Sequence, residues 1–255
     1  MNLKRFDKIK ESEQYDTAIE AYRIKCLNDF FFFSKHFLGY KDLDWNVHGQ
    51  FIQAFQSNAQ RKILVMPRGT FKSTLGSVAY PIWRLLRDPD LTILLDSELY
   101  SNSKNFLREI KHHFASDRMS QIFGPQVGPK WDEGEIILKT RTKNIKEASI
   151  TVGGLGTTKV GQHYGCIIGD DYNSPQNSET VEKCQKVIDH VRYNLNILNP
   201  GGEYLFIGTR YAERDVIGWL LGDILGEKYL AEGKMKLTEG LLNKSDDDIL
   251  GERDV

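Results

Sequence analysis

The sequence predicts an α/β protein with a mostly parallel sheet and helices on both of its faces. From Lys62 onward, short aliphatic and β-branched runs alternate with longer amphipathic stretches, and strands separated by helices of this length pair in parallel. The chain of 255 residues is long enough to bury the core of one large α/β domain, or of one domain with a small satellite.

The N-terminal segment is expected to be helical. Apolar residues recur at helical spacing between residues 9 and 38, which suits one or two helices packed on a core, and residues 45–55 predict another helix. We therefore separate a helical segment (residues 1–58) from an α/β core (residues 59–230) and a polar C-terminal tail (residues 231–255).

Within the core, strands and helices should alternate. The expected strands are KILVM, LTILLD, EIIL, ASITV, GCIIGD and EYLFIGT, and the expected helices cover residues 72–86, 101–114 and 181–195. In a parallel sheet, ligands bind beyond the carboxyl ends of the strands. Chemistry is therefore expected in the residues that directly follow each strand.

The composition is typical of a cytosolic globular protein. The 34 basic and 35 acidic residues leave a net charge of −1, which neither indicates nor excludes nucleic acid, because a local basic stripe can neutralise phosphates. The three cysteines show no disulfide or zinc-site spacing. The most apolar run, FFFF at residues 30–33, is far shorter than the roughly 20 residues of a membrane span. We expect no membrane contact.

The stretch ILVMPRGTFKST (residues 63–74) fits a strand followed by a phosphate-binding loop. In the pattern GxxxxGK[ST], backbone N–H groups surround the β-phosphate, the lysine contacts β and γ oxygens, and the hydroxyl binds Mg²⁺. Lys72 and Ser73 match this pattern, whereas Met66 and Phe71 occupy the glycine positions. The loop by itself fits a nucleotide site and an ordinary strand, turn and helix equally well. A nucleotide site would consist of Pro67, Arg68, Gly69, Thr70, Phe71, Lys72, Ser73 and Thr74.

Two carboxylates end the predicted strand GCIIGDD. Asp170 is placed to hold Mg²⁺ through Ser73 or a water, and Asp171 to orient and deprotonate an attacking water. Taken alone, such a run is more often a helix cap or a solvated turn. We expect the loop and the carboxylates to lie in one crevice, at the ends of adjacent strands.

The motifs PRGTFKST, GQHYGCIIGDD and LFIGTR follow one another in this order. On these motifs, residues 45–220 resemble the ATPase domain of the large terminase subunit of tailed phages, a DNA-packaging motor that is similar to RecA-like ASCE P-loop NTPases. The resemblance implies a P-loop ATPase core over residues 59–230 that uses ATP and Mg²⁺, with an adenine-side region inside residues 1–58. The family continues into a nuclease domain. We expect residues 231–255 to be a tail or the start of a linker to such a domain, without nuclease activity.

The resemblance also implies a role for each motif residue. Lys72 would bind the β- and γ-phosphates, and Asp171 would be the catalytic carboxylate, where the family more often has glutamate. Ser73 and Asp170 would hold the Mg²⁺. Arg68 would contact the γ-phosphate from the same subunit. The coupling motif, which senses loss of the γ-phosphate, would be Gly208, Thr209 and Arg210, and the adenine contact would be Gln50.

A second arginine is expected from the neighbouring subunit of a ring. The candidates are Arg108, Arg118 and Arg141, of which we choose Arg141 in the basic run KTRTKNIK. The same run also fits a DNA-contacting loop or an ordinary exposed hairpin. Lys104 and Lys111 fall at helical spacing with Arg108, and this basic face could contact phosphates or be solvated.

Phe71 bears on how well the loop binds a nucleotide. Glycine at this position allows unusual backbone angles, whereas phenylalanine is restricted to ordinary φ. The sequence therefore predicts either a loop with ordinary φ at Phe71 or weak nucleotide binding.

The implied partners are double-stranded DNA, the portal protein and the small terminase subunit. We expect a homo-oligomeric ring on the procapsid, a monomer in isolation, and a location in the host cell cytoplasm. Two alternatives stay open: a helicase-like, nucleic-acid-dependent ATPase, and a P-loop interaction module that does not hydrolyse ATP.

Overall fold

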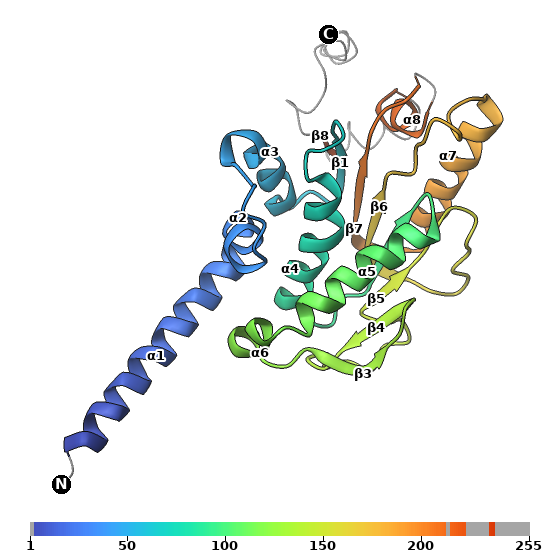
Figure 1. Ribbon diagram of the computed structural model, residues 1–255. Helices are drawn as coiled ribbons and strands as arrows, with labels where there is room; N and C mark the ends of the chain where they lie inside the picture. Colours follow the sequence, from blue (N-terminus) through green and yellow to red (C-terminus); the bar gives the residue numbers. More distant parts are fainter. Residues whose placement is uncertain (1–2, 213–214, 223–234, 238–255) are drawn as a thin grey trace.

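The computed structural model describes residues 3–212, 215–222 and 235–237, which form an α/β structure (Figure 1). Its eight-stranded sheet has the order β3-β4-β5-β2-β6-β7-β1-β8. The strands are β1 (Arg61–Val65), β2 (Ile93–Ser97), β3 (Val127–Trp131), β4 (Glu135–Leu138), β5 (Ile150–Val152), β6 (Tyr164–Asp170), β7 (Leu198–Gly208) and β8 (Met235–Leu237).

The sheet is mostly parallel, as predicted. Neighbouring strands from β5 through β2, β6, β7 and β1 to β8 pair in parallel, and only β3 and β4 add antiparallel pairs at one end. Two short strands were not expected. β3 contains a glycine and a proline, and β8 lies within residues 231–255, for which the sequence predicts a tail or the start of a linker. A run of three residues is too short to show the alternation of a strand.

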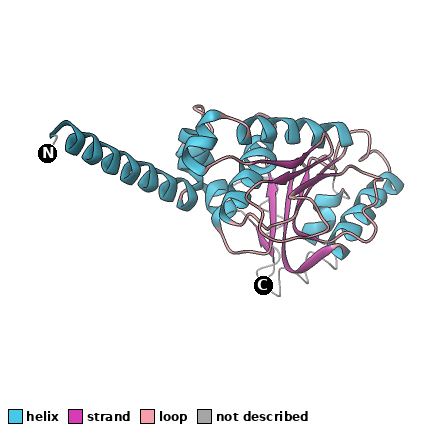
Figure 2. Ribbon diagram, turned by 90° about the horizontal axis from the view of Figure 1, so that it is seen from below, coloured by secondary structure: helices cyan, strands magenta, loops and turns pink. Residues whose placement is uncertain are grey.

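Helices cover both faces of the sheet (Figure 2). They are α1 (Leu3–Asn28), α2 (Phe30–Phe32), the π-helix η1 (Phe33–Phe37), α3 (Trp45–Gln56), the π-helix η2 (Thr74–Ala79), α4 (Tyr80–Arg87), α5 (Tyr100–Phe114), α6 (Asp117–Phe123), α7 (Val181–Asn196) and α8 (Val216–Gly222). Helices α1 to α6 share one hydrophobic cluster, and α7 and α8 share the other. In both figures, the N-terminal half of α1 extends away from the rest of the fold. In the described part of the chain, no helix has the length and apolar character needed to cross a membrane.

Successive residues of the central strands point to opposite hydrophobic clusters. In β2, Ile93 and Leu95 pack toward α1 to α6, whereas Leu94 packs toward α7 and α8. All three side chains are at most 1% exposed, and each stabilises the fold by roughly 1.5–3 kcal/mol through burial. Because both faces are covered, these strands appear in the sequence as continuous apolar runs rather than as alternating patterns.

The helix after the phosphate loop packs unusually close to the sheet. A Cβ at Gly76 would lie 1.9 Å from Cδ1 of Ile207, so any larger residue at this position of η2 would force the Ile207 side chain to move. Pro81 is the second residue of α4, which follows the π-helix η2 directly. Because proline lacks an N–H and its ring crowds the carbonyl one turn earlier, it disfavours regular α-helical hydrogen bonds at this point, where η2 has its wider turns. π-turns of this kind are frequent at functional sites.

Candidate functional site

The predicted phosphate loop connects β1 to the helix that begins at Lys72. Its first residue, Met66, donates its N–H to the carbonyl of Gly208 at 3.0 Å, and the Thr70 hydroxyl donates to the carbonyl of Pro67 at 2.8 Å. Gly69 has a φ of +80°, a left-handed conformation that suits glycine. The loop therefore reverses direction just beyond the end of the strand.

Phe71 adopts a left-handed backbone, so the expectation of an ordinary φ at this residue is wrong. Its φ is +58°, which costs a non-glycine residue roughly 1–2 kcal/mol. Its half-buried ring packs on the core and meets the ring of His48, on α3, edge to face at a centroid distance of 5.7 Å. Packing of the ring thus holds the backbone in this conformation. Of the two outcomes expected for Phe71, weak nucleotide binding stays a prediction.

Lys72 and Asp171 meet just beyond the carboxyl ends of β1 and β6. Lys72 is only 7% exposed, and its Nζ donates to Oδ2 of Asp171. Asp171 has a φ of +45°. Its Oδ1 is buried and has no hydrogen-bond partner among the described residues. A strained backbone and an unsatisfied buried oxygen are features that cluster at functional sites.

Asp170, the residue before Asp171, is fully buried at the end of β6. Its Oδ1 accepts from the Ser73 hydroxyl at 3.2 Å and its Oδ2 from the Ser77 hydroxyl at 2.6 Å. Burial, and secondarily the charge of Asp171, raises the pKa of Asp170 to about 6. Sequence reasoning missed Ser77, although its spacing of one helical turn from Ser73 places both hydroxyls on one helix face.

The donor set fits a magnesium ion that is completed by phosphate and water oxygens. The described residues contain no group of three His, Cys, Asp or Glu side chains that could hold a metal. Mg²⁺ sites at phosphates, however, use one or two protein ligands plus water and phosphate oxygens. The Ser73 hydroxyl and the buried Asp170 carboxylate supply such ligands, and a cation beside them would offset the poorly solvated charge of Asp170.

The loop strand and the carboxylate strand are not neighbours, contrary to our expectation. β7 lies between β1 and β6. Its end binds both parts of the site, because Asp171 donates its N–H to the carbonyl of Ile207 at 2.8 Å and Met66 donates to Gly208. The Thr209 hydroxyl also donates to the carbonyl of Met66 at 3.0 Å. The predicted coupling residues thus lie between the loop and the carboxylates.

Arg68 contacts the segment that follows β7. Its Nε and Nη2 donate to the Tyr211 hydroxyl at 3.1 and 2.5 Å. Tyr211 in turn donates its N–H at 2.9 Å to Asp215, a buried carboxylate that also caps the start of α8. Arg210, between Thr209 and Tyr211, is half-buried. The predicted cis arginine and the predicted coupling segment are therefore in direct contact.

A buried polar network supports the backbone at Asp171. Oδ2 of Asp96, at the end of β2, accepts from the Tyr172 hydroxyl at 2.9 Å and from Nδ2 of Asn194 at 2.7 Å, and lies 2.6 Å from Nε2 of His190. Tyr172 folds back under β6 over Gly169, where a Cβ would lie 2.3 Å from its ring. The fold thus anchors the residue next to Asp171 through α7 and β2. Asp96 ends the predicted strand LTILLD, and no local pattern indicates its partners on α7.

Gln50 and Arg141 do not join this site. Gln50 is exposed on α3, two residues from His48. Arg141 lies in the connection of the β4–β5 hairpin, and the neighbouring Thr142 is bound by Asp90, which precedes β2. Arg141 therefore lies on the β3–β5 side of the sheet, far from the phosphate loop of its own chain, which follows β1 on the other side. Its Nε and Nη2 are buried without a hydrogen-bond partner among the described residues, and burial lowers its pKa.

The basic face of α5 is tied to the β3–β4 hairpin. Lys104 forms an ion pair with Glu133, and Nζ of Lys111 donates to the carbonyl of Trp131 at 3.0 Å. Arg108 donates to the side chain of Asn105, and Arg118 to the Tyr22 hydroxyl and the His36 carbonyl. The lysines of α5 therefore hold a neighbouring element in place.

Comparisons with known proteins point to one kind of fold. No family model matches the sequence, and no curated protein sequence matches it. Among solved structures, the crystal structure of the HK97 bacteriophage large terminase matches with a TM-score of 0.51 at 14% sequence identity. The match covers 76% of this chain and 38% of the terminase chain, so this protein corresponds to well under half of that structure. At this identity the similarity concerns the fold alone, and the chain has a terminase-like α/β fold.

Proposed function

We propose that this chain is the Mg²⁺-dependent ATPase motor domain of a viral terminase large subunit and powers translocation of double-stranded DNA into a procapsid. One observation carries the proposal. Lys72, Ser73, Asp170 and Asp171 converge at one end of the sheet although two distant segments supply them. The fold similarity to a phage large terminase supports the same conclusion.

The residues suit the hydrolysis of a nucleoside triphosphate. Lys72 and the backbone N–H groups of residues 67–74 would bind the β- and γ-phosphates. Ser73 and Asp170 would hold Mg²⁺, which when bound neutralises phosphate charge. Asp171 would orient the attacking water and accept its proton. In this structure Asp171 is paired with Lys72, so a phosphate that binds Lys72 also releases the carboxylate for this role.

Coupling to motion would run through the end of β7. Arg68 would move from the Tyr211 hydroxyl to the γ-phosphate, because a charge-assisted contact with a phosphate is stronger than one with a neutral hydroxyl. Tyr211 is joined to Asp215 and through it to α8. Loss of the γ-phosphate would return Arg68 to Tyr211 and change the position of this segment.

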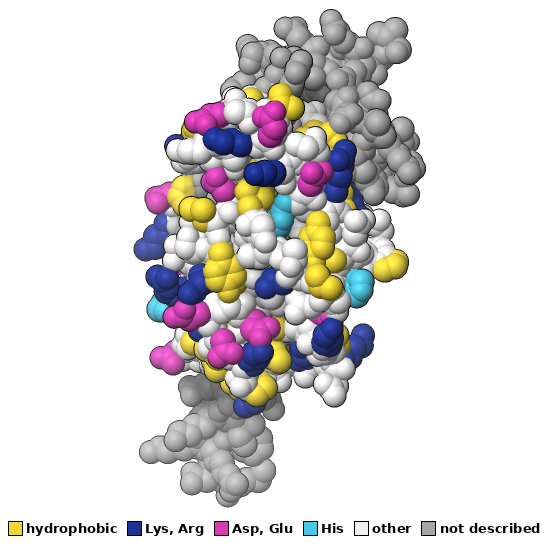
Figure 3. Space-filling view, turned by 90° about the vertical axis from the view of Figure 1, so that its right-hand side faces the viewer, with side chains coloured by type: hydrophobic (Ala, Val, Ile, Leu, Met, Phe, Trp, Pro, Cys, Tyr) yellow, Lys and Arg dark blue, Asp and Glu magenta, His cyan; other side chains and the backbone are white. Residues whose placement is uncertain are grey.

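The assembly belongs to the same proposal. We propose double-stranded DNA, a portal protein and a small terminase subunit as partners, in the cytoplasm of a host cell, with a ring on the procapsid and a monomer in isolation. Arg141, at the far edge of the sheet, would act on a neighbouring subunit. On the face that carries α7, basic and acidic side chains are interspersed (Figure 3), so we do not place the DNA on this face.

A second candidate is a P-loop interaction module without turnover. The left-handed Phe71 and the ion pair of Lys72 with Asp171 favour it, because both oppose the entry of a nucleotide. The two functions differ in their response to Lys72→Ala. An ATPase loses its activity, whereas an interaction module keeps its partner.

The test is ATP hydrolysis with Mg²⁺ at rising protein concentration. Lys72→Ala and Asp170→Ala should each abolish turnover, whereas the exposed, ion-paired Lys183 serves as a control, and Lys183→Ala should leave turnover unchanged. A rate per subunit that rises with concentration indicates an arginine supplied by a neighbour. Absence of both turnover and nucleotide binding at every concentration would refute the ATPase and favour the interaction module.

A further inference from the structure

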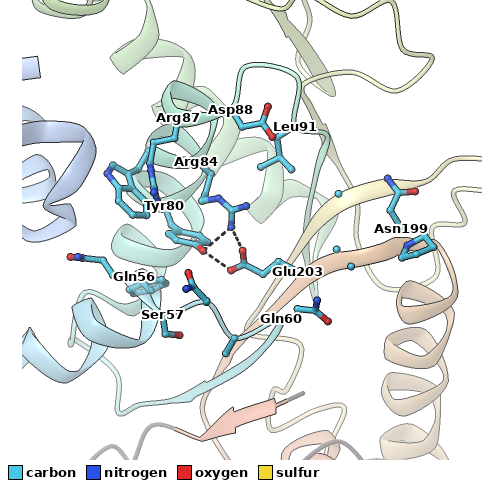
Figure 4. A pocket seen from close by; sticks show the side chains of 18 residues that line it. Gln56, Ser57, Gln60, Tyr80, Arg84, Arg87, Asp88, Leu91, Asn199 and Glu203 are labelled. Atoms are coloured by element: carbon cyan, nitrogen blue, oxygen red, sulfur yellow. Dashed lines mark hydrogen bonds and ion pairs between the residues drawn. The ribbon is translucent and has the colours of Figure 1, made fainter. Parts of the chain in front are cut away.

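A cavity of about 720 Å³ lies at the amino-terminal ends of β1, β6 and β7, the opposite end of these strands from the phosphate loop (Figure 4). It is bounded by residues 55–60, which run from the end of α3 to the start of β1, by one face of α4 and by residues 199–203 of β7. This volume lies within the range of about 300–1,000 Å³ that is typical of small-molecule sites. The proposed ATPase cycle uses none of these residues.

The inner wall of the cavity is a buried cluster in which three donors share one carboxylate. Glu203, which is 8% exposed, accepts from Nζ of Lys62 at 2.7 Å, from the Tyr80 hydroxyl at 2.5 Å and from Nη1 of Arg84. Figure 4 shows Tyr80, Arg84 and Glu203 pointing toward one another. Two cations therefore face a single anion in a largely water-excluded place.

The cluster is short of negative charge. Lys62 is 2% exposed and also donates to the carbonyl of Phe55. The titratable groups around it are Tyr80 and Arg84 of α4, Glu203 of β7 and Cys166 of β6. Burial, and secondarily the charge of Arg84, lowers the pKa of Lys62, whereas the Glu203 carboxylate at 2.7 Å favours its charged form. An added anion would favour the charged form of Lys62.

The rim of the cavity adds another cation and several amides. Arg87 lies one helical turn beyond Arg84, on the same face of α4. It is exposed, and its guanidinium stacks over the ring of Trp83 at 4.3 Å. The rim also carries one carboxylate, Asp88, which is exposed at the end of α4 and whose charge acts on Arg84. The amide side chains that line the cavity are Gln56, Asn58, Gln60 and Asn199.

We propose that this cavity binds an oxyanion, the phosphate or carboxylate group of a small polar ligand, with Arg84 and Arg87 as its charged contacts. A guanidinium presents paired N–H donors that match the oxygens of both groups. The amides of the lining would bind the remaining polar atoms of the ligand. The site is separate from the phosphate loop, so its existence does not depend on the proposed ATPase.

The test is calorimetric titration of the full-length chain with sulfate, which is the analogue of a phosphate group, and with succinate, which is a dicarboxylate. Both titrations are repeated with Lys72→Ala, because an anion can also bind the phosphate loop. We expect saturable binding that survives Lys72→Ala and that Arg87→Glu weakens about tenfold or more, the range of a hydrogen bond to a charged group. Tighter binding of sulfate or of succinate identifies the phosphate or the carboxylate as the preferred group.

Arg192→Glu is the matched control. Arg192 also stacks on a tryptophan, Trp219, at 5.0 Å, but it lies on α7 on the other face of the sheet. Arg192→Glu should therefore leave the affinity unchanged. Binding of neither anion, binding that disappears with Lys72→Ala, or equal losses with Arg87→Glu and Arg192→Glu would each overturn the proposal.

Lys62→Met gives a second readout. It removes one of the two cations that share Glu203, so Glu203 is left to Arg84 and competes more strongly with an added anion for its guanidinium. Sulfate affinity should therefore fall in folded Lys62→Met. Unchanged sulfate affinity in this variant would contradict the assignment of the anion to the side chains around Lys62.

Discussion

Lys72 and Asp171, 99 positions apart in the chain, form an ion pair between the first turn of the loop helix and the end of β6. The backbone of Asp171 is bonded to the end of β7, as is that of Met66 at the start of the loop. The central strand β7 thus sets the distance between the proposed phosphate-binding lysine and the proposed catalytic carboxylate. The ion pair also competes with any phosphate for the lysine.

Asp171→Asn should tighten nucleotide binding while it abolishes hydrolysis. The neutral amide no longer competes for Lys72, so a phosphate gains a free ammonium group. An ion pair of this exposure stabilises the protein by about 1 kcal/mol. Without it, the dissociation constant of the nucleotide should therefore fall severalfold. Titration with a fluorescent ADP analogue, beside an ATPase assay, measures both effects. Unchanged affinity would show that the ion pair does not oppose the nucleotide.

Phe71→Gly should raise nucleotide affinity and lower thermal stability. Glycine removes the left-handed strain of roughly 1–2 kcal/mol, but the variant also loses the contact of the ring with His48. Gly69→Ala is the companion variant, because a Cβ there meets no atom within 4 Å and adds only backbone strain at φ +80°. It should weaken nucleotide binding. Tight ATP binding by the unaltered chain would show that the strain at Phe71 is harmless.

Asp170→Asn should stabilise the metal-free protein while it abolishes hydrolysis. The pKa of Asp170 rises from 3.8 to about 6 on folding, which corresponds to at most roughly 3 kcal/mol. The raised pKa means that the folded state holds the extra proton, so the contribution of Asp170 to stability is fully present below about pH 4 and is lost as the pH rises through about 6. At neutral pH, Asp170→Asn should gain about 1–3 kcal/mol in chemical denaturation.

The control for Asp170→Asn is Asp189→Asn, which changes a carboxylate that is 60% exposed on α7. Asp189→Asn should change the free energy of unfolding at neutral pH by less than about 0.5 kcal/mol, as is usual for an exposed side chain. If Asp170→Asn is no more stable than the unaltered chain at neutral pH without metal, the Asp170 carboxylate is not destabilised by burial.

Tyr172→Phe should reduce turnover more than nucleotide binding. The variant loses the hydrogen bond to Asp96, which costs about 1 kcal/mol and loosens the backbone next to Asp171. A small misplacement of a catalytic group can lower kcat by one to two orders of magnitude, about 10- to 100-fold. Tyr164→Phe is the control, because its hydroxyl bonds to Gln162 at the other end of β6. An equal loss of kcat in both variants would indicate general destabilisation.

Local patterns predicted the elements of the site correctly. The helix from Lys72, the strands β1, β2, β6 and β7 and the position of both aspartates follow from short apolar runs and the residues after them. They are predictable because a buried strand and its terminal polar residues are encoded by neighbouring positions. Helical spacing also places Ser77 on the same helix face as Ser73, although the sequence analysis did not name it, and its contact with Asp170 is a long-range one.

Strand order, backbone angles and long-range contacts were decided only by the tertiary structure. The sequence predicted adjacent strands for the loop and the carboxylates, but β7 lies between them. The sequence also predicted either an ordinary φ at Phe71 or weak nucleotide binding. In the structure, the Phe71 ring packs on His48 and φ is +58°. Pairing between distant strands and packing of a ring depend on contacts that no local pattern records. The sequence by itself thus determined which residues end the strands, and the tertiary structure decided which of those ends meet.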